Sequence, residues 1–153
     1  MPRLLIIHHT PSPPTHALFE AVRDGATDDA IEGVEVMVQP ALAVTVPDVL
    51  GADGYLLGTP ANFGYMSGAL KHAFDTVYYP VLDATRGRPY GLWVHGNNDT
   101  AGAVRAVETI TRGLGWVLAQ PVLEVVGSPG PEAIDTAWEL GAAFAAGLTL
   151  HAA

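Results

Sequence analysis

The sequence predicts an α/β domain: a doubly wound, five-stranded parallel sheet with helices on both faces. Three observations lead to this prediction. Strand-like and helix-like segments alternate along the 153 residues. Several of the strand-like segments are continuous apolar runs, which are typical of strands buried on both faces. Loops rich in Gly, Pro, Asn, Ser and Thr follow three of them. With right-handed crossovers, the element order predicts strand order 2-1-3-4-5 in a single domain over residues 1–153.

The first half of the chain is expected to supply three strands. Leu18, Phe19, Val22 and Ala26 recur at helical spacing, so a helix should separate the first two strands. In chain order the predicted segments are a strand at 4–8, a Pro-rich turn at 9–14, that helix, an edge strand at 33–38, a short helix or irregular connection at 41–50, and a strand at 54–57.

The second half is expected to supply two strands and three helices. Ser67 is a plausible N-cap for a helix whose inner face carries Leu70, Phe74, Val77 and Tyr78. A strand at 90–95, a loop at 96–99 and a helix at 101–113 follow. The last strand lies within 116–126 and is interrupted by Pro121, which cannot donate to a sheet. The closing helix, 131–148, is predicted to present Ile134, Trp138, Gly141, Ala145 and Leu148 on one stripe.

Composition excludes several classes of function. The net charge of -9, with only seven scattered Lys and Arg residues, argues against a nucleic-acid partner. The absence of cysteine excludes disulfides, thiolate metal sites and a Cys nucleophile. The six histidines lack metal-type spacing, so no metal site is expected. No signal-peptide pattern or membrane-length apolar run is present, so a cytoplasmic location without membrane association is expected.

The segment 58–71 is the most informative part of the chain. Its Gly and Pro residues allow backbone to approach a flat ligand, and Phe63 and Tyr65 stand where a turn would usually expose polar residues. In the predicted strand order, loops 9–16, 59–66 and 95–101 meet where the order reverses, between strands 1 and 3. Open α/β sheets bind ligands at such a point.

This segment resembles the second flavin loop of flavodoxin-like proteins, and within them the NAD(P)H-dependent FMN reductases and NAD(P)H:quinone oxidoreductases. The matching residues are Gly58-Thr59-Pro60, Gly64, Met66-Ser67-Gly68, Leu70-Lys71 and Phe74-Asp75. The resemblance implies a homodimer or homotetramer that binds FMN non-covalently. It would pass hydride from NAD(P)H through the flavin to a small-molecule acceptor, a quinone or a flavin. The chemistry would lie on the flavin, without a catalytic side chain.

The resemblance also implies which residues hold the flavin. In the first loop, the hydroxyls of Thr10, Ser12 and Thr15 and the helix N-terminus near His16 would hold the phosphate. In the second loop, the segment Pro60, Ala61, Asn62, Phe63 and Gly64 would run along the isoalloxazine. In the third loop, His95, Gly96, Asn97 and Asn98 would approach the pyrimidine edge. His8, at the end of the first strand, is expected to be a packed or hydrogen-bonded residue.

The chain departs from the family pattern in two places, and these keep two alternatives open. Pro11, Pro13 and Pro14 remove three backbone donors from the phosphate loop, which favours a flavin-free binding domain. The third loop, 96–102, has no aromatic residue to stack on a flavin. That absence favours a reductase with an open flavin face over the other alternative, a flavodoxin-type electron carrier without its own substrate.

Overall fold

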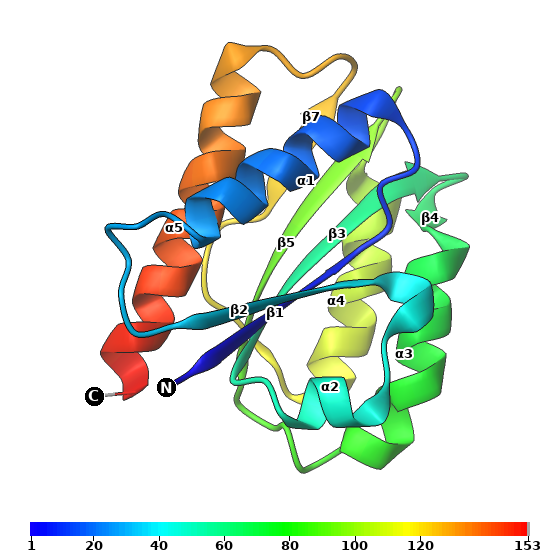
Figure 1. Ribbon diagram of the computed structural model, residues 1–153. Helices are drawn as coiled ribbons and strands as arrows, with labels where there is room; N and C mark the ends of the chain where they lie inside the picture. The colour runs from blue at the N-terminus through cyan, green and yellow to red at the C-terminus, as the bar shows by residue number, and fades with distance from the viewer. Residues whose placement is uncertain (153) are drawn as a thin grey trace.

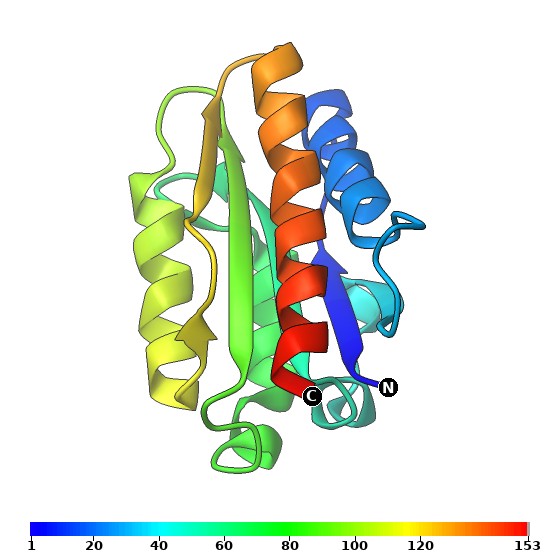
Figure 2. The same ribbon diagram turned by 90° about the vertical axis from the view of Figure 1, so that its left-hand side faces the viewer.

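A central β-sheet lies between two layers of helices in the computed structural model, which describes residues 1–152 (Figures 1 and 2). The strands are β1 (Arg3–His8), β2 (Glu35–Pro40), β3 (Gly54–Asn62), β4 (Tyr65–Met66), β5 (Pro89–Gly96), β6 (Val117–Leu118) and β7 (Leu123–Val126). The helices are α1 (Pro13–Ala26), the short 3-10 helix η1 (Ala41–Ala43), α2 (Val46–Leu50), α3 (Gly68–Val81), α4 (Ala101–Leu114) and α5 (Pro131–Ala152).

The sheet has seven strands, and its main path runs β2-β1-β3-β5-β6. All pairs on this path are parallel, and β7 pairs with β5 beyond β6. The predicted α/β class is confirmed, with its parallel sheet and its reversal of order at β1, but the predicted count of five strands is wrong. The run containing Pro121 is divided into β6 and β7. In addition, residues 58–62, predicted as a turn, continue β3 and pair antiparallel with β4.

The two faces of the sheet bury separate cores. Along β1, Leu4 and Ile6 pack with α1 and α5, whereas Leu5 and Ile7 pack with the α2, α3 and α4 side. This alternation explains why the central positions of β1, Leu4 to Ile7, are all apolar. Figure 2 shows α5 and α1 side by side on one face of the sheet.

Two glycines allow α1 and α5 to meet at backbone distance. A Cβ added to Gly25 would lie 1.9 Å from the Trp138 carbonyl oxygen, and one added to Gly141 would lie 2.0 Å from the Val22 carbonyl oxygen. The predicted stripe on α5 is therefore only partly right. Gly141, Ala145 and Leu148 are buried, but Trp138 is 38% exposed. The remaining buried positions of α5 are Ala137, Leu140 and Phe144, which were not predicted.

At the amino edge of the sheet, Arg88 fixes the end of α2. Its Nη1 donates to the carbonyl oxygens of Val49, Leu50 and Ala52 at 3.3, 2.9 and 2.6 Å. These contacts tie the start of β5 to the segment that ends α2, where the Val49 carbonyl oxygen also accepts from the Tyr55 hydroxyl at 2.6 Å. Among residues 1–152, no helix combines the length and apolar character needed to cross a bilayer.

Candidate functional site

The candidate site lies at the carboxyl edge of the sheet, where the strand order reverses between β1 and β3. The pocket there has a volume of about 230 Å³. Small-molecule sites usually have volumes of roughly 300–1,000 Å³, so this pocket can enclose only part of a ligand. The predicted residues that line it are Ser12, Thr15, Pro60, Ala61, Asn62, His95, Gly96 and Asn97. Pro11 and Pro14 also line it, although from the sequence they were expected only to remove backbone donors from the first loop.

The first loop ends in a closed capping box. Ser12 is the N-cap of α1, and its Oγ accepts from the Thr15 N–H at 3.4 Å. In return, Thr15 Oγ1 accepts from the Ser12 N–H at 3.1 Å and donates to the Ser12 carbonyl oxygen at 3.0 Å. Pro13 and Pro14 occupy the first two helical positions. Such positions tolerate proline because their N–H groups have no partner within the helix.

Two histidines flank this loop, and both are engaged by neighbouring side chains. The His8 ring stacks on Phe19, with centroids 3.9 Å apart, and its Nδ1 lies 2.9 Å from Thr10 Oγ1. Burial lowers the pKa of His8 to about 4, with smaller contributions from His16, His9 and Arg23, so the ring is neutral at neutral pH. His8 is therefore packed and hydrogen bonded, as predicted. His16 Nε2 contacts Glu20 Oε1 at 2.9 Å, along the helix.

The second loop is a two-residue hairpin turn. Asn62 pairs with Tyr65, and the residues between them, Phe63 and Gly64, have φ of 52° and 76°. Positive φ at both central positions is what tight hairpins require. Phe63 is fully exposed at the tip. The turn is fixed against α4, because a Cβ added to Gly102 would lie 2.0 Å from the Gly64 carbonyl oxygen.

The third loop begins at the last two residues of β5, His95 and Gly96, and both of them contact Gly127, which follows β7. His95 lines the pocket and is 5% exposed, and its Nε2 lies 2.8 Å from the Gly127 carbonyl oxygen. Gly96 is required by a close approach, since a Cβ there would lie 2.5 Å from the Asp99 carbonyl oxygen. Asn97 and Asn98 remain exposed.

The predicted residues outside the pocket wall lie around its margin. Thr10 is turned toward His8, and His16 toward Glu20. Phe63 and Gly64 form the hairpin tip, and Asn98 lies one position beyond the lining residue Asn97. No Lys or Arg lines the pocket. Within the described part of the chain, no group of three or more His, Asp or Glu side chains is arranged to hold a metal ion.

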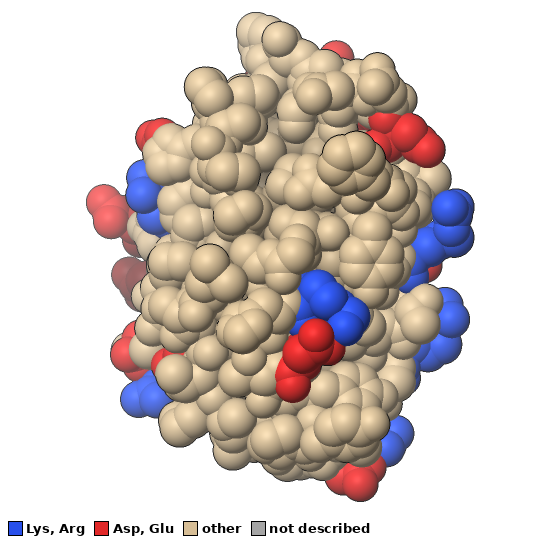
Figure 3. All heavy atoms as spheres, turned by 90° about the vertical axis from the view of Figure 1, so that its right-hand side faces the viewer, with Lys and Arg blue, Asp and Glu red and all other residues tan. Residues whose placement is uncertain are grey.

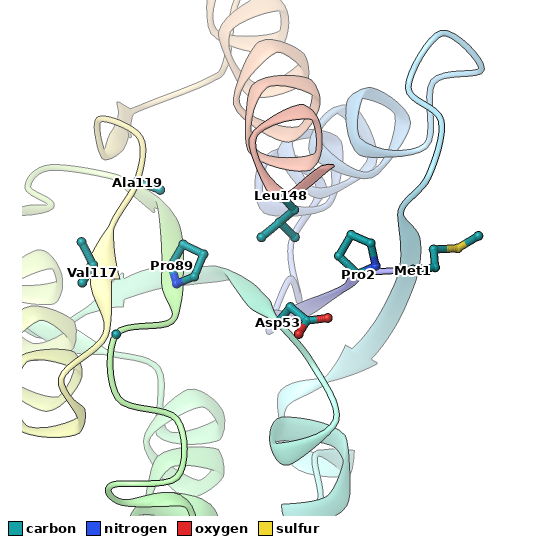
Figure 4. Close-up of a pocket in the computed structure, with 8 residues that line it drawn as sticks. Met1, Pro2, Asp53, Pro89, Val117, Ala119 and Leu148 are labelled. Atoms are coloured by element: carbon teal, nitrogen blue, oxygen red, sulfur yellow. The ribbon is translucent and has the colours of Figure 1, made fainter. Parts of the chain in front are cut away.

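A larger cavity of about 740 Å³ lies at the opposite, amino edge of the sheet (Figure 4). Its lining is Met1, Pro2, Asp53, Gly87, Pro89, Val117, Ala119 and Leu148. Asp53 is the charged side chain of this lining, and its Oδ2 already accepts from the Arg3 N–H at 2.7 Å. The smaller crevice is the better candidate because polar groups from three loops converge on it.

Comparisons with solved structures show the fold. An archaeal flavodoxin superposes with a TM-score of 0.78 at 16% identity, covering 96% of this chain and 99% of that one. The flavodiiron core Flv1 of Synechocystis gives 0.82 at 18% identity, covering 98% of this chain and 36% of that one. A WrbA-like flavodoxin from Agrobacterium tumefaciens gives 0.76 at 15% identity, covering 99% of both chains.

Sequence comparison shows the family. A curated flavodoxin of Aquifex aeolicus is 38% identical over 77 residues, which are 50% of this chain and 40% of that protein. The chain thus matches well under two thirds of that relative's length. The profile of the NADPH-dependent FMN reductase family matches residues 16–129, which include the hairpin and the third loop. The chain therefore has a flavodoxin-like fold and belongs to the NADPH-dependent FMN reductase family.

Proposed function

We propose that this chain binds FMN in the crevice and is an NAD(P)H-dependent oxidoreductase that reduces a quinone or a flavin. The observation that carries the proposal is the convergence of three loops where the strand order reverses. The family match supports the same cofactor and reductant. When bound, FMN would supply the electron-transfer chemistry, and the protein would supply position and electrostatics.

The residues of the second and third loops fit the ring system of a flavin. The edge of an isoalloxazine needs both donors and acceptors, which the amides of Asn62 and Asn97 provide together. Pro60 and Gly96 also line the crevice, and neither has a long side chain that would keep a flat ring away from the backbone. The ring would therefore be held mainly by residues 60–62 and 96–98.

The third loop favours a reductase over an electron carrier. No aromatic residue stands in 96–102 to cover a flavin, and the Phe63 ring is fully exposed at the hairpin tip. One face of a bound ring would thus stay open to a second planar substrate. The carrier remains the second candidate, because the curated relative is named a flavodoxin and the net charge of -9 would suit a basic redox partner.

Anaerobic mixing with NADPH or NADH tests the proposal. We expect the protein to accelerate bleaching of the visible FMN band, with a rate that saturates in nicotinamide nucleotide. Asn97→Leu should weaken FMN binding by removing an amide at the crevice, whereas Gln120→Leu, which removes an amide away from the crevice, should not. Bleaching no faster than in protein-free solution, although FMN binds, would favour the carrier.

We also propose that a second copy of the chain docks on a groove between α3 and α4. Lys71, Phe74, Asp75, Tyr78, Tyr79 and Ile110 line this α3–α4 groove. Two copies that each carry a charge of -9 repel one another, so an interface needs a face with little net charge. Figure 3 shows that the face on the α3 side is mostly uncharged. In the groove, Lys71 and Asp75 form an ion pair at 2.6 Å and balance one another.

A further inference from the structure

The first loop has few backbone donors left for a phosphate. Pro11, Pro13 and Pro14 have no N–H group. The N–H groups of His9, Ser12, Thr15 and His16 already donate, to Gly58 O, Thr15 Oγ1, Ser12 Oγ and Ser12 O respectively. Within 9–16, at most the Thr10 N–H is left. A helix N-terminus binds anions through its free N–H groups, and here proline and the capping box remove them.

The hydroxyl groups of the loop are largely used as well. Thr15 is 2% exposed, and its hydroxyl donates to the Ser12 carbonyl oxygen at 3.0 Å. Ser12 Oγ lies 2.9 Å from Thr15 Oγ1. Thr10 Oγ1 lies 2.9 Å from His8 Nδ1, so its proton is free only if His8 carries its own proton on that nitrogen. The loop therefore offers a few neutral donors at most.

No compensating positive charge stands at this end of the crevice. Neither Lys nor Arg lines the pocket, and His8 is neutral at neutral pH. Two other imidazoles belong to this loop, and neither lines the pocket: His9, and His16, which contacts the Glu20 carboxylate at 2.9 Å. A phosphate dianion bound here would lose its hydration and gain neither a cation nor a full set of N–H donors, which is unfavourable.

We propose that this site recognises a flavin by its ring system and accepts riboflavin and FMN almost equally, because the first loop does not bind the 5′-phosphate. This inference rests on the proposed flavin-binding function and specifies its ligand class. The second and third loops, with Asn62 and Asn97, supply the selective contacts. The phosphate of a bound FMN would meet a loop in which Ser12 and Thr15 already hydrogen bond to one another. A flavin held in this way exchanges with the bulk more readily than one anchored at both ends.

Equilibrium titrations of flavin fluorescence with the wild-type protein test the inference. We expect the Kd values for FMN and riboflavin to agree within about fivefold. Inorganic phosphate should not compete with FMN. An FMN preference of about a hundredfold or more would overturn the inference and leave the proposed function standing. Failure of both flavins to bind would overturn the proposed function and the inference together.

A variant that restores a donor makes the test sharper. Pro13→Ala returns an N–H group to the first turn of α1 at a residue that does not line the pocket, so FMN affinity should rise about fivefold while riboflavin affinity stays unchanged. Pro47→Ala is the matched control, because Pro47 stands in the first turn of α2 behind a similar capping box, formed by Thr45 and Asp48. It should change neither affinity. Equal tightening of both flavins in Pro13→Ala, or any tightening of FMN in the control, would contradict the inference.

Discussion

At the scale of single residues, Phe63 has a backbone conformation that its residue type disfavours. Its φ of 52° lies in the left-handed region, which costs a residue with a Cβ about 1–2 kcal/mol. The ring is fully exposed, so packing within the chain does not repay that cost. Strain of this kind is characteristic of functional sites, and this residue stands at the mouth of the crevice.

Phe63→Asn should therefore stabilise the fold. Asn tolerates positive φ and, followed by Gly64, gives the Asn-Gly pair that tight hairpins prefer. We expect the free energy of unfolding to rise by about 1 kcal/mol, which corresponds to a rise in Tm of about 2–4 °C. Phe63→Ala removes the ring but keeps a Cβ at positive φ, so it should give no such gain. Thermal unfolding of the two variants compares them, and equal Tm values would contradict this account of strain.

His8 gives the stability of the protein a specific pH dependence. Its pKa falls from 6.5 in the unfolded chain to about 4 in the fold, so the unfolded state binds the proton more readily. The contribution of His8 to stability is complete above about 6.5 and is lost as the pH falls toward about 4. His8→Asn keeps a polar atom near Thr10 and cannot titrate, so its unfolding free energy should fall less steeply over that window. Parallel urea titrations measure both slopes, and identical slopes would show that His8 titrates normally.

At the scale of elements, the sequence predicted which helices and strands exist, and their order, better than it predicted where each one ends. Apolar runs and turn residues located the main strands and helices because those signals are local. Whether residues 58–62 continue β3 depended on a partner strand at 65–66, which is a tertiary contact. The buried face of α5 was partly wrong because the α1–α5 crossing, with backbone contacts at Gly25 and Gly141, sets the rotation of that helix.

The helix crossing yields a prediction with an internal control. Gly141→Ala would place a Cβ 2.0 Å from the Val22 carbonyl oxygen, so α1 and α5 must move apart. We expect the free energy of unfolding to fall by about 2 kcal/mol or more, as in other overpacked cores. Gly147→Ala in the same helix meets nothing within 4 Å and should stabilise by up to about 1 kcal/mol through helix propensity. Denaturant unfolding distinguishes the two, and a stable Gly141→Ala protein would disprove the close contact.

At the scale of the whole molecule, the sequence was sufficient to predict which three loops meet at one edge of the sheet. The general rule for doubly wound sheets directs ligands to the reversal of strand order, and the loops predicted to meet there do so. The sequence also showed that Pro11, Pro13 and Pro14 depart from the phosphate loop of the family. It could not show that Ser12 and Thr15 satisfy one another, because that depends on side-chain geometry within the loop. Nor could it show that Thr10 turns toward His8, which depends on the stacking of His8 on Phe19.

Association through the α3–α4 groove is the prediction at this scale. Tyr79 is 80% exposed in the groove, and Tyr79→Glu adds an uncompensated negative charge there. We expect this variant to be monomeric by light scattering under conditions in which the wild-type protein is a dimer or larger. Leu150→Glu, at a comparably exposed apolar position on α5, is the control and should leave the assembly intact. A wild-type monomer, or an assembly that survives Tyr79→Glu, would contradict the proposed interface.

Backbone amide chemical shifts measured during an FMN titration show whether flavin binds in the crevice between the three loops. We expect the shifted amides to cluster in 9–16, 59–66 and 95–101, with the larger changes in the second and third loops. Changes centred instead on the amino-edge cavity, near Asp53 and Leu148, would contradict this expectation.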